Sequence, residues 1–241
     1  MLSDRNSAKD AFSSSGITKH KRQCLCLKKA GEISVFLLMY ISLFLSALAI
    51  SVVMCAQNSD LYFRIQERCL IFEGGQAEDK EAVQRMNRAI VDFLSGKAEK
   101  IDGVSERAGA HMQDVKRIFD FVKATLFLLI LFSVCVLYGK RFANPKGIWL
   151  LSLAPILLSL ALLLAFAFSD FTELFTRFHE IAFTNDLWLL NPAEDLLIRC
   201  LPEQFFFEMA LIAFGIGIAL YGLMAVCAIT IINKFGRRDT Q

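Results

Sequence analysis

The sequence has few histidines and none of the common signatures of soluble hydrolases. It contains three His and two Trp in 241 residues, and charge is nearly absent from four long stretches. It has no Gly-rich phosphate loop, no G-x-S-x-G and no H-E-x-x-H, so hydrolases that depend on those motifs lose their support. Its seven cysteines show no zinc-ligand spacing.

Apolar residues dominate the composition. The chain is 55% hydrophobic and contains 22 Phe, which is typical of a membrane protein. Crossing a hydrocarbon core of roughly 30 Å takes about 20 helical residues, and four runs are long enough: 33–56, 121–139, 147–168 and 205–232. Since helix is the only plausible spanning form here, we predict an all-α polytopic membrane protein with four transmembrane helices and helical extracytoplasmic loops.

Basic residues indicate how this four-helix membrane domain, residues 33–232, is oriented. They accumulate in residues 1–32, in the short turn after the second run and in the tail 233–241, and such segments face the cytoplasm. The loops 57–120 and 169–204 have more acidic than basic residues and are expected outside. Segment 1–32 has little apolar surface to bury and is expected to be disordered.

The outer loops contain several helix signals. Residues 83–94 have apolar side chains at helical spacing before Gly96, which predicts an amphipathic helix. Ser105 is the expected N-cap of a long helix that enters the second run, and Asn191-Pro192 is the expected start of another helix. Trp188 is most simply an interfacial anchor.

Two side-chain pairings remain open from the sequence. Lys123 and Glu208 lie just inside the outer ends of their runs, where they can pair with each other or extend toward the headgroups. Cys69 and Cys200 lie on the same side of the membrane, and the sequence does not decide whether they pair.

His111 and His179 are the best candidates for chemistry, because each outer loop contains one of them. His111 precedes the second run by ten residues and His179 follows the third by eleven, so straight helices would place both about 15 Å from the hydrocarbon edge. Asp114 lies at i+3 from His111, while Asn185 and Asp186 follow His179 by about two helical turns. We therefore expect a polar cluster built around the two histidines.

Three interpretations of this cluster are possible. The imidazoles can act in acid–base catalysis. Alternatively, His111, Asp114, His179 and Asp186 can form a two-His, carboxylate metal site. In the third interpretation, the protein is a non-enzymatic membrane adaptor and both segments are surfaces for helix packing.

Two blocks of sequence resemble a known family. The segments ERAGAHMQDVK (106–116) and FHEIAFTNDLW (178–188), followed by Asn191-Pro192 and PEQFF (202–206), look like the signature blocks of the four-span bacterial lipoprotein intramolecular transacylases. The resemblance covers about residues 33–232. It implies a multi-pass protein of the bacterial cell membrane, with both termini in the cytoplasm and the active site outside.

The resemblance also implies a reaction. The sn-2 acyl chain of a lipoprotein's S-diacylglyceryl cysteine would move to the α-amino group of that cysteine, which leaves the lyso form. Carried over to this chain, His179 is the expected general base and His111 its partner. Asp114 would orient His111 and Asn185 would donate to the oxyanion, with Asp186 and Trp188 as further supporting residues.

The same resemblance sets expectations for partners. The nucleophile and the ester would belong to one substrate molecule, so no acyl-enzyme is required. We expect diacylglyceryl-modified lipoproteins and membrane lipids as partners, a monomer, and no cofactor, metal or nucleic acid.

Overall fold

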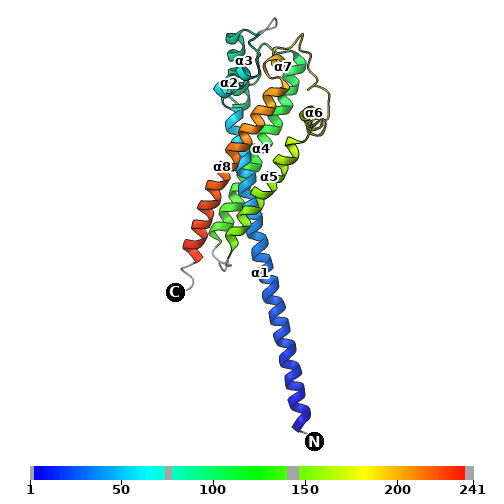
Figure 1. Cartoon of the computed structure of the whole chain (residues 1–241), viewed down its shortest axis with the longest axis vertical. Helices are drawn as coiled ribbons and strands as arrows, with labels where there is room; N and C mark the ends of the chain where they lie inside the picture. The colour runs from blue at the N-terminus through cyan, green and yellow to red at the C-terminus, as the bar shows by residue number, and fades with distance from the viewer. Residues whose placement is uncertain (1–2, 74–77, 140–146, 237–241) are drawn as a thin grey trace.

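The structure, a computed structural model, describes residues 3–73, 78–139 and 147–236. These residues form helices and no strands, as predicted. Long helical segments make an elongated bundle, and shorter helices gather toward one end of it (Figure 1). The long segments are α1 (Ser3–Ala56), α4 (Glu106–Tyr138), η1 (Ile148–Ser152) continued by α5 (Leu153–Ala167), and α8 (Glu203–Gly236); the short helices are α2 (Ser59–Arg68), α3 (Lys80–Ser95), α6 (Phe171–Ala182) and α7 (Leu196–Cys200).

Among the residues that the structure describes, three helices are long and apolar enough to cross a membrane. They are Leu25–Ala56, Glu106–Tyr138 and Glu203–Lys234, with mean hydropathies of 2.5, 2.3 and 2.3. The third predicted run is divided into the 3-10 helix η1 and α5, and its apolar helix Ile148–Leu164 is shorter. At about 2.0 Å per residue in η1 and 1.5 Å in α5, the two together reach roughly 30 Å. Four spans remain a prediction.

The bundle is assembled around α1, which packs against both α4 and α8. A Cβ added at Gly217 on α8 would lie 2.6 Å from Leu48 Cδ2 and 3.4 Å from Leu48 Cα on α1, so a larger residue there would require the Leu48 side chain to move. The hydroxyl of Ser42 on α1 donates to the Leu129 carbonyl of α4 at 2.9 Å. Small residues and hydroxyl hydrogen bonds of this kind typically hold helices together inside membranes.

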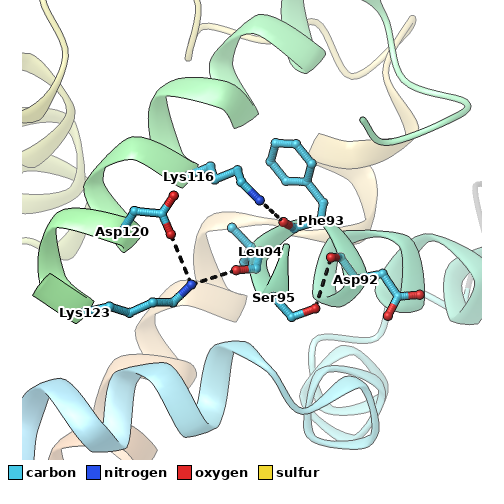
Figure 2. A network of polar contacts seen from close by, with 7 residues as sticks. All are labelled: Asp92, Phe93, Leu94, Ser95, Lys116, Asp120 and Lys123. Atoms are coloured by element: carbon cyan, nitrogen blue, oxygen red, sulfur yellow. Dashed lines mark hydrogen bonds and ion pairs between the residues drawn. The ribbon is translucent and has the colours of Figure 1, made fainter. Parts of the chain in front are cut away.

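Helix α3 forms where the apolar spacing predicted it and ends at Gly96, whose φ is 84°. Figure 2 shows how its C-terminal end is fixed to α4: Lys116 Nζ donates to the Phe93 carbonyl and Lys123 Nζ to the Leu94 carbonyl at 3.0 Å. Carbonyls in the last turn of a helix have no partner within the helix, and a cation is favourable there. The two lysines therefore attach the outer helix α3 to the helix that carries His111.

The possible pair of Lys123 with Glu208 does not form. Lys123 Nζ is 3.2 Å from Asp120 Oδ1, one turn earlier on α4. Glu208 instead pairs with Arg68 of α2, with Oε2 and Nε 2.5 Å apart. Each charge has a nearer partner on the outer side of the bundle, so neither supports an intramembrane functional site.

A buried pair of amides connects α2, α3 and α7. Gln66 and Asn87 are 0% and 1% exposed, and their side chains bond to each other in both directions at 3.0 and 2.7 Å. Gln66 Nε2 also donates to the Cys200 carbonyl at 2.9 Å. Because these polar groups satisfy one another, they can lie inside an otherwise apolar core.

The structure differs from the sequence expectations at two helix starts. Residues 3–32, expected to be disordered, continue α1, because extending an existing helix costs far less than nucleating one. Asn191 caps a turn by accepting from the Ala193 N–H at 3.0 Å, and α7 begins only at Leu196, after Asp195. Apolar composition and an N-cap motif alone did not locate the starts of α1 and α7.

The two outer cysteines considered for pairing, Cys69 and Cys200, are free thiols. Cys200 is fully buried in the outer core, whereas Cys69 is only partly buried. No disulfide therefore connects the two outer loops at this point.

Candidate active site

His111 of α4 and His179 of α6 lie side by side. Their ring centroids are 6.1 Å apart and the ring planes differ by 33°. Both side chains are buried, with 8% and 9% of their surface exposed. The structure thus brings together the two histidines that the sequence placed in separate outer loops.

Local capping explains where the two helices begin. Ser105 accepts a hydrogen bond from the Ala108 N–H at 3.1 Å, as expected for the N-cap of α4. Asp170 caps α6 by accepting from the Thr172 N–H at 2.9 Å. With these starts, His111 lies in the second turn of α4 and His179 in the last turn of α6.

The hydrogen bond of His179 indicates its tautomer. Its Nδ1 lies 2.7 Å from the main-chain oxygen of Phe175, one turn earlier. A carbonyl oxygen can only accept, so Nδ1 must carry a proton. In the neutral ring the lone pair is then on Nε2, and that atom can accept a proton from a substrate.

The burial of His111 affects its hydrogen bonding and its charge. Its Nδ1 is buried and has no hydrogen-bond partner in the described part of the chain. The pKa of His111 is lowered to about 4, mainly by burial and then by the charge of His179, while the carboxylate of Asp114 opposes both effects. His111 is therefore a neutral imidazole near pH 7, and it can donate a hydrogen bond without carrying charge.

Aromatic rings surround the histidine pair. The Phe183 ring centroid is 4.9 Å from that of His111 and 5.6 Å from that of His179. His179 also contacts Phe175 at 4.3 Å and Trp188 at 4.9 Å between centroids. Trp188, interpreted from the sequence as an interfacial anchor, thus packs on the candidate base. The spacing of Phe175, His179 and Phe183 at four-residue intervals was the available signal for this cluster.

The polar residues near the pair are arranged differently from the expectation. Asp114 was expected to orient His111, but its carboxylate bonds to Arg117 Nη1 at 2.7 Å and accepts from Asn185 Nδ2 at 2.9 Å. The Asn185 side-chain oxygen accepts from the Leu187 N–H at 3.0 Å. The structure therefore connects Asp114 with Asn185, and within its described residues neither makes a hydrogen bond with a histidine.

Asp186 contributes its backbone carbonyl to the site. The residue that donates to this carbonyl, Arg107, was not identified from the sequence. Arg107 Nη2 donates to the Asp186 carbonyl, and Arg107 Nε donates to the Leu189 carbonyl at 3.1 Å. Arg107 precedes His111 by one helical turn within the first sequence block, and this position was the only sequence signal for it.

A buried carboxylate provides a further tie between the loop and α4. Asp195 is buried, and its Oδ1 accepts from the backbone N–H of Ser105 at 3.1 Å. Segment 183–195, which we call the aromatic loop, is therefore attached to the first turns of α4 at several points. These attachments place Phe183 and Trp188 against the histidines.

The alternative metal site lacks a set of ligands. Among the described residues, no three His, Cys, Asp or Glu side chains are grouped so that they could hold one ion. His111, Asp114, His179 and Asp186 do not form such a group, because the Asp114 carboxylate bonds to Arg117 and Asn185.

Comparisons with known proteins agree with this architecture. The family model described as lipoprotein intramolecular transacylase Lit matches residues 37–206. A structure of the membrane-integral lipoprotein intramolecular transacylase Lit from Bacillus cereus is 20% identical, with a TM-score of 0.70 over 88% of this chain and 99% of that chain. A variant of that protein with one histidine replaced by arginine is 21% identical, with a TM-score of 0.70 over 91% and 99%.

A second variant, with a histidine replaced by alanine, is 20% identical and has a TM-score of 0.67 over 90% of this chain and 98% of that chain. A comparison with curated proteins finds no match. At these identities the solved structures show a shared fold, and the family model provides the evidence of relationship.

Proposed function

We propose that this chain, which belongs to the lipoprotein intramolecular transacylase family, moves the sn-2 acyl chain of an S-diacylglyceryl cysteine to the α-amino group of the same cysteine. The product is an N-acyl, S-monoacylglyceryl lyso-lipoprotein. The observation that supports this most directly is the pair of buried histidines, 6.1 Å apart, inside an aromatic enclosure at the end of a membrane bundle.

The reaction makes three chemical demands. The α-ammonium, with an ordinary pKa near 8, must lose a proton to become a nucleophile. Its nitrogen then attacks the ester carbonyl carbon, whose oxygen becomes an oxyanion. When the bond from this carbon to the glycerol oxygen breaks, the glycerol oxygen gains the proton that was first removed from the nitrogen, and the nitrogen loses its second proton to solvent.

We assign the proton transfer to His179. Its Nδ1 is oriented by the Phe175 carbonyl, which leaves Nε2 as the atom that accepts. The ring takes the proton from the attacking nitrogen and delivers it to the departing glycerol oxygen, so it ends the cycle unchanged. A positioned acid–base group of this kind typically contributes 10² to 10⁴ in rate.

We assign oxyanion stabilisation to His111. Its buried Nδ1 has no partner among the described residues, and an unpaired buried N–H is rarer in proteins than an unpaired acceptor. The tautomer with the proton on Nε2 is therefore favoured, and this N–H can donate to the developing oxyanion. Since its pKa is lowered to about 4, the His111 ring is a weak base near pH 7 and does not compete with His179 for the substrate proton.

No acyl-enzyme is needed for this reaction. The nucleophile and the ester belong to one lipoprotein, and holding them in contact supplies much of the rate gain. The aromatic rings around the pair restrict water, which would otherwise hydrolyse the ester. We infer that diacylglyceryl-modified lipoproteins are the substrates and that a monomer suffices.

The site is proposed to lie on the extracytoplasmic side. Helix α1 begins and α8 ends at the end of the bundle remote from α6 and the outer helices (Figure 1). Lys and Arg accumulate in the segments at that same end, which favours the cytoplasm for it. The histidines would then lie at the opposite, extracytoplasmic end of the bundle.

The decisive experiment is mass spectrometry of lipoprotein N-terminal peptides from cells with and without this gene. We expect the N-acyl monoacylglyceryl form only in cells that express the protein. Purified protein mixed with a synthetic diacylglyceryl lipopeptide should form the same product. If diacylglyceryl peptides remain unchanged in both assays, the proposed reaction is wrong for this family member.

A further inference from the structure

Arg107 donates hydrogen bonds to the backbone of the aromatic loop on both sides of Trp188. Its guanidinium donates to the carbonyl of Asp186, two residues before Trp188, and to the carbonyl of Leu189, the residue after it. The Trp188 ring lies on His179, with centroids 4.9 Å apart. The two hydrogen bonds thus bracket the side chain that contacts the proposed base.

Helix stability does not explain an arginine at this position. Arg107 is the second residue of α4, directly after Glu106, and a cation at a helix N-terminus opposes the helix dipole. The loop carbonyls compensate for this cost by accepting its N–H groups. A planar guanidinium can reach two carbonyls at once in a fixed geometry, whereas the ammonium of lysine is a single compact charge.

The first two turns of α4 carry both Arg107 and His111. His111 follows Arg107 by four residues on α4, so the two side chains share a face. Arg107 therefore sets the distance between the helix that holds His111 and the loop that covers His179. The Asn185–Asp114 and Asp195–Ser105 hydrogen bonds hold the loop on either side of this point.

We propose that Arg107 is a positioning residue, which holds Trp188 against His179 and so fixes the orientation of the His179 ring opposite His111. It acts through the loop and touches no reacting atom. The effect on Trp188 follows from geometry alone, while the effect on rate rests on the proposed transacylase function.

The two tryptophans permit a direct structural test. Trp149, 51% exposed and located in η1, can be replaced by Phe, which leaves Trp188 as the sole indole. In this background we expect Arg107→Ala to shift Trp188 emission to longer wavelength and to increase its quenching by acrylamide. Arg107→Lys should show a smaller change in the same direction, because an ammonium can replace only part of the hydrogen bonding of the guanidinium to the two loop carbonyls.

Two controls separate this effect from general loosening. Arg64→Ala removes an exposed arginine of α2 whose described contact is within its own helix, to the Asp60 carbonyl at 3.4 Å, and should leave Trp188 emission unchanged. His179→Gln should alter Trp188 emission without a comparable increase in acrylamide access, because the loop stays attached. If Arg107→Ala fails to fold, Arg107→Lys retains the charge and keeps the comparison valid.

Kinetics on a diacylglyceryl lipopeptide test the second half of the proposal. Small misplacements far from the reacting atoms can lower a rate by about 10², so we expect kcat of Arg107→Ala to fall by about that factor with little change in KM. Unchanged Trp188 fluorescence in Arg107→Ala would show that Arg107 does not hold Trp188 against His179. Altered fluorescence with normal kcat would overturn the positioning role.

Failure of the proposed function is distinguishable from failure of this inference. If the wild-type protein itself forms no product, the transacylase proposal fails, and the fluorescence comparison still decides whether Arg107 holds Trp188. If wild-type product forms and the Arg107 variants match the wild-type protein in both fluorescence and kcat, both parts of this inference are wrong and the transacylase proposal stands.

Discussion

The Nδ1 atom of His179 lies 2.7 Å from the main-chain oxygen of Phe175, a residue one turn earlier on the same helix. Because a carbonyl oxygen only accepts, the ring proton is on Nδ1 and the lone pair of the neutral ring is on Nε2. The acceptor is a main-chain oxygen, so the tautomer of His179 does not depend on a polar side chain nearby. The predictions about activity depend on this arrangement.

Replacing His179 by Ala should abolish lyso-lipoprotein formation. Loss of a positioned proton-transfer group typically costs 10² to 10⁴ in rate, whereas the bundle is held by helix packing elsewhere. The measurement is the ratio of N-acyl monoacylglyceryl to diacylglyceryl peptides in cells that contain matched amounts of membrane-inserted protein. Wild-type product from His179→Ala would remove it as the base, and loss of wild-type activity on addition of EDTA would favour the metal-site alternative.

Replacing His111 by Gln should impair activity and also change how stability depends on pH. The pKa of His111 is lowered from 6.5 to about 4, so between these values the unfolded chain binds more protons than the folded one. Stability therefore rises with pH across this window and is lost as pH falls through it, by about 3 kcal/mol at most. Thermal unfolding in detergent from pH 4 to 7 should show a shallower slope for His111→Gln, whereas His20→Gln should behave as wild type.

The Asp114–Asn185 hydrogen bond should couple these residues energetically. Asn185→Ala removes the donor of the bond that joins α4 to the aromatic loop, and Asp114→Asn removes the charge of its acceptor. A hydrogen bond to a charged group is typically worth about 1.5–3 kcal/mol, less at an exposed site such as this. We expect each single variant to be milder than His179→Ala and the double variant to be no worse than either. Fully additive losses in kcat would show that the two residues act independently.

The buried amides Gln66 and Asn87 should matter for stability and not for chemistry. Gln66→Leu leaves Asn87 unpaired inside the core, which costs roughly 1–3 kcal/mol, whereas replacing both by Leu removes the unmatched polar group. Unfolding midpoints should therefore drop in each single variant and recover partly in the double variant. Equal losses in all three variants would mean that packing volume, and not hydrogen bonding, governs the site.

The orientation in the membrane can be tested with single cysteines on a background that lacks the native ones. Lys100→Cys should react with an impermeant maleimide in spheroplasts, and Lys19→Cys should react only after lysis, because the Lys and Arg distribution places the N-terminal segment inside. Labelling of the residue 19 variant alone in intact spheroplasts would reverse the topology and place the histidines in the cytoplasm.

Local patterns in the sequence were enough for much of the architecture. A backbone in lipid must satisfy its hydrogen bonds within each segment, so long apolar runs identify helices without any knowledge of their neighbours. The amphipathic spacing of α3, its end at Gly96 and the N-cap Ser105 are likewise short-range features, and the structure confirms all three. These patterns did not predict the division of the third run into η1 and α5 or the late start of α7.

By itself, the sequence determined that the chain is an all-helical membrane protein with one histidine in each of the loops 57–120 and 169–204. Only the tertiary structure decided that these histidines lie 6.1 Å apart, that Asp114 bonds to Asn185, and that Arg107 grips the loop around Trp188. The physical reason is that helical periodicity specifies which residues share a face, whereas the rotation and tilt of one helix against another depend on all the side chains packed between them. Contacts between α4 and the aromatic loop are set by that packing, which no short stretch of sequence contains.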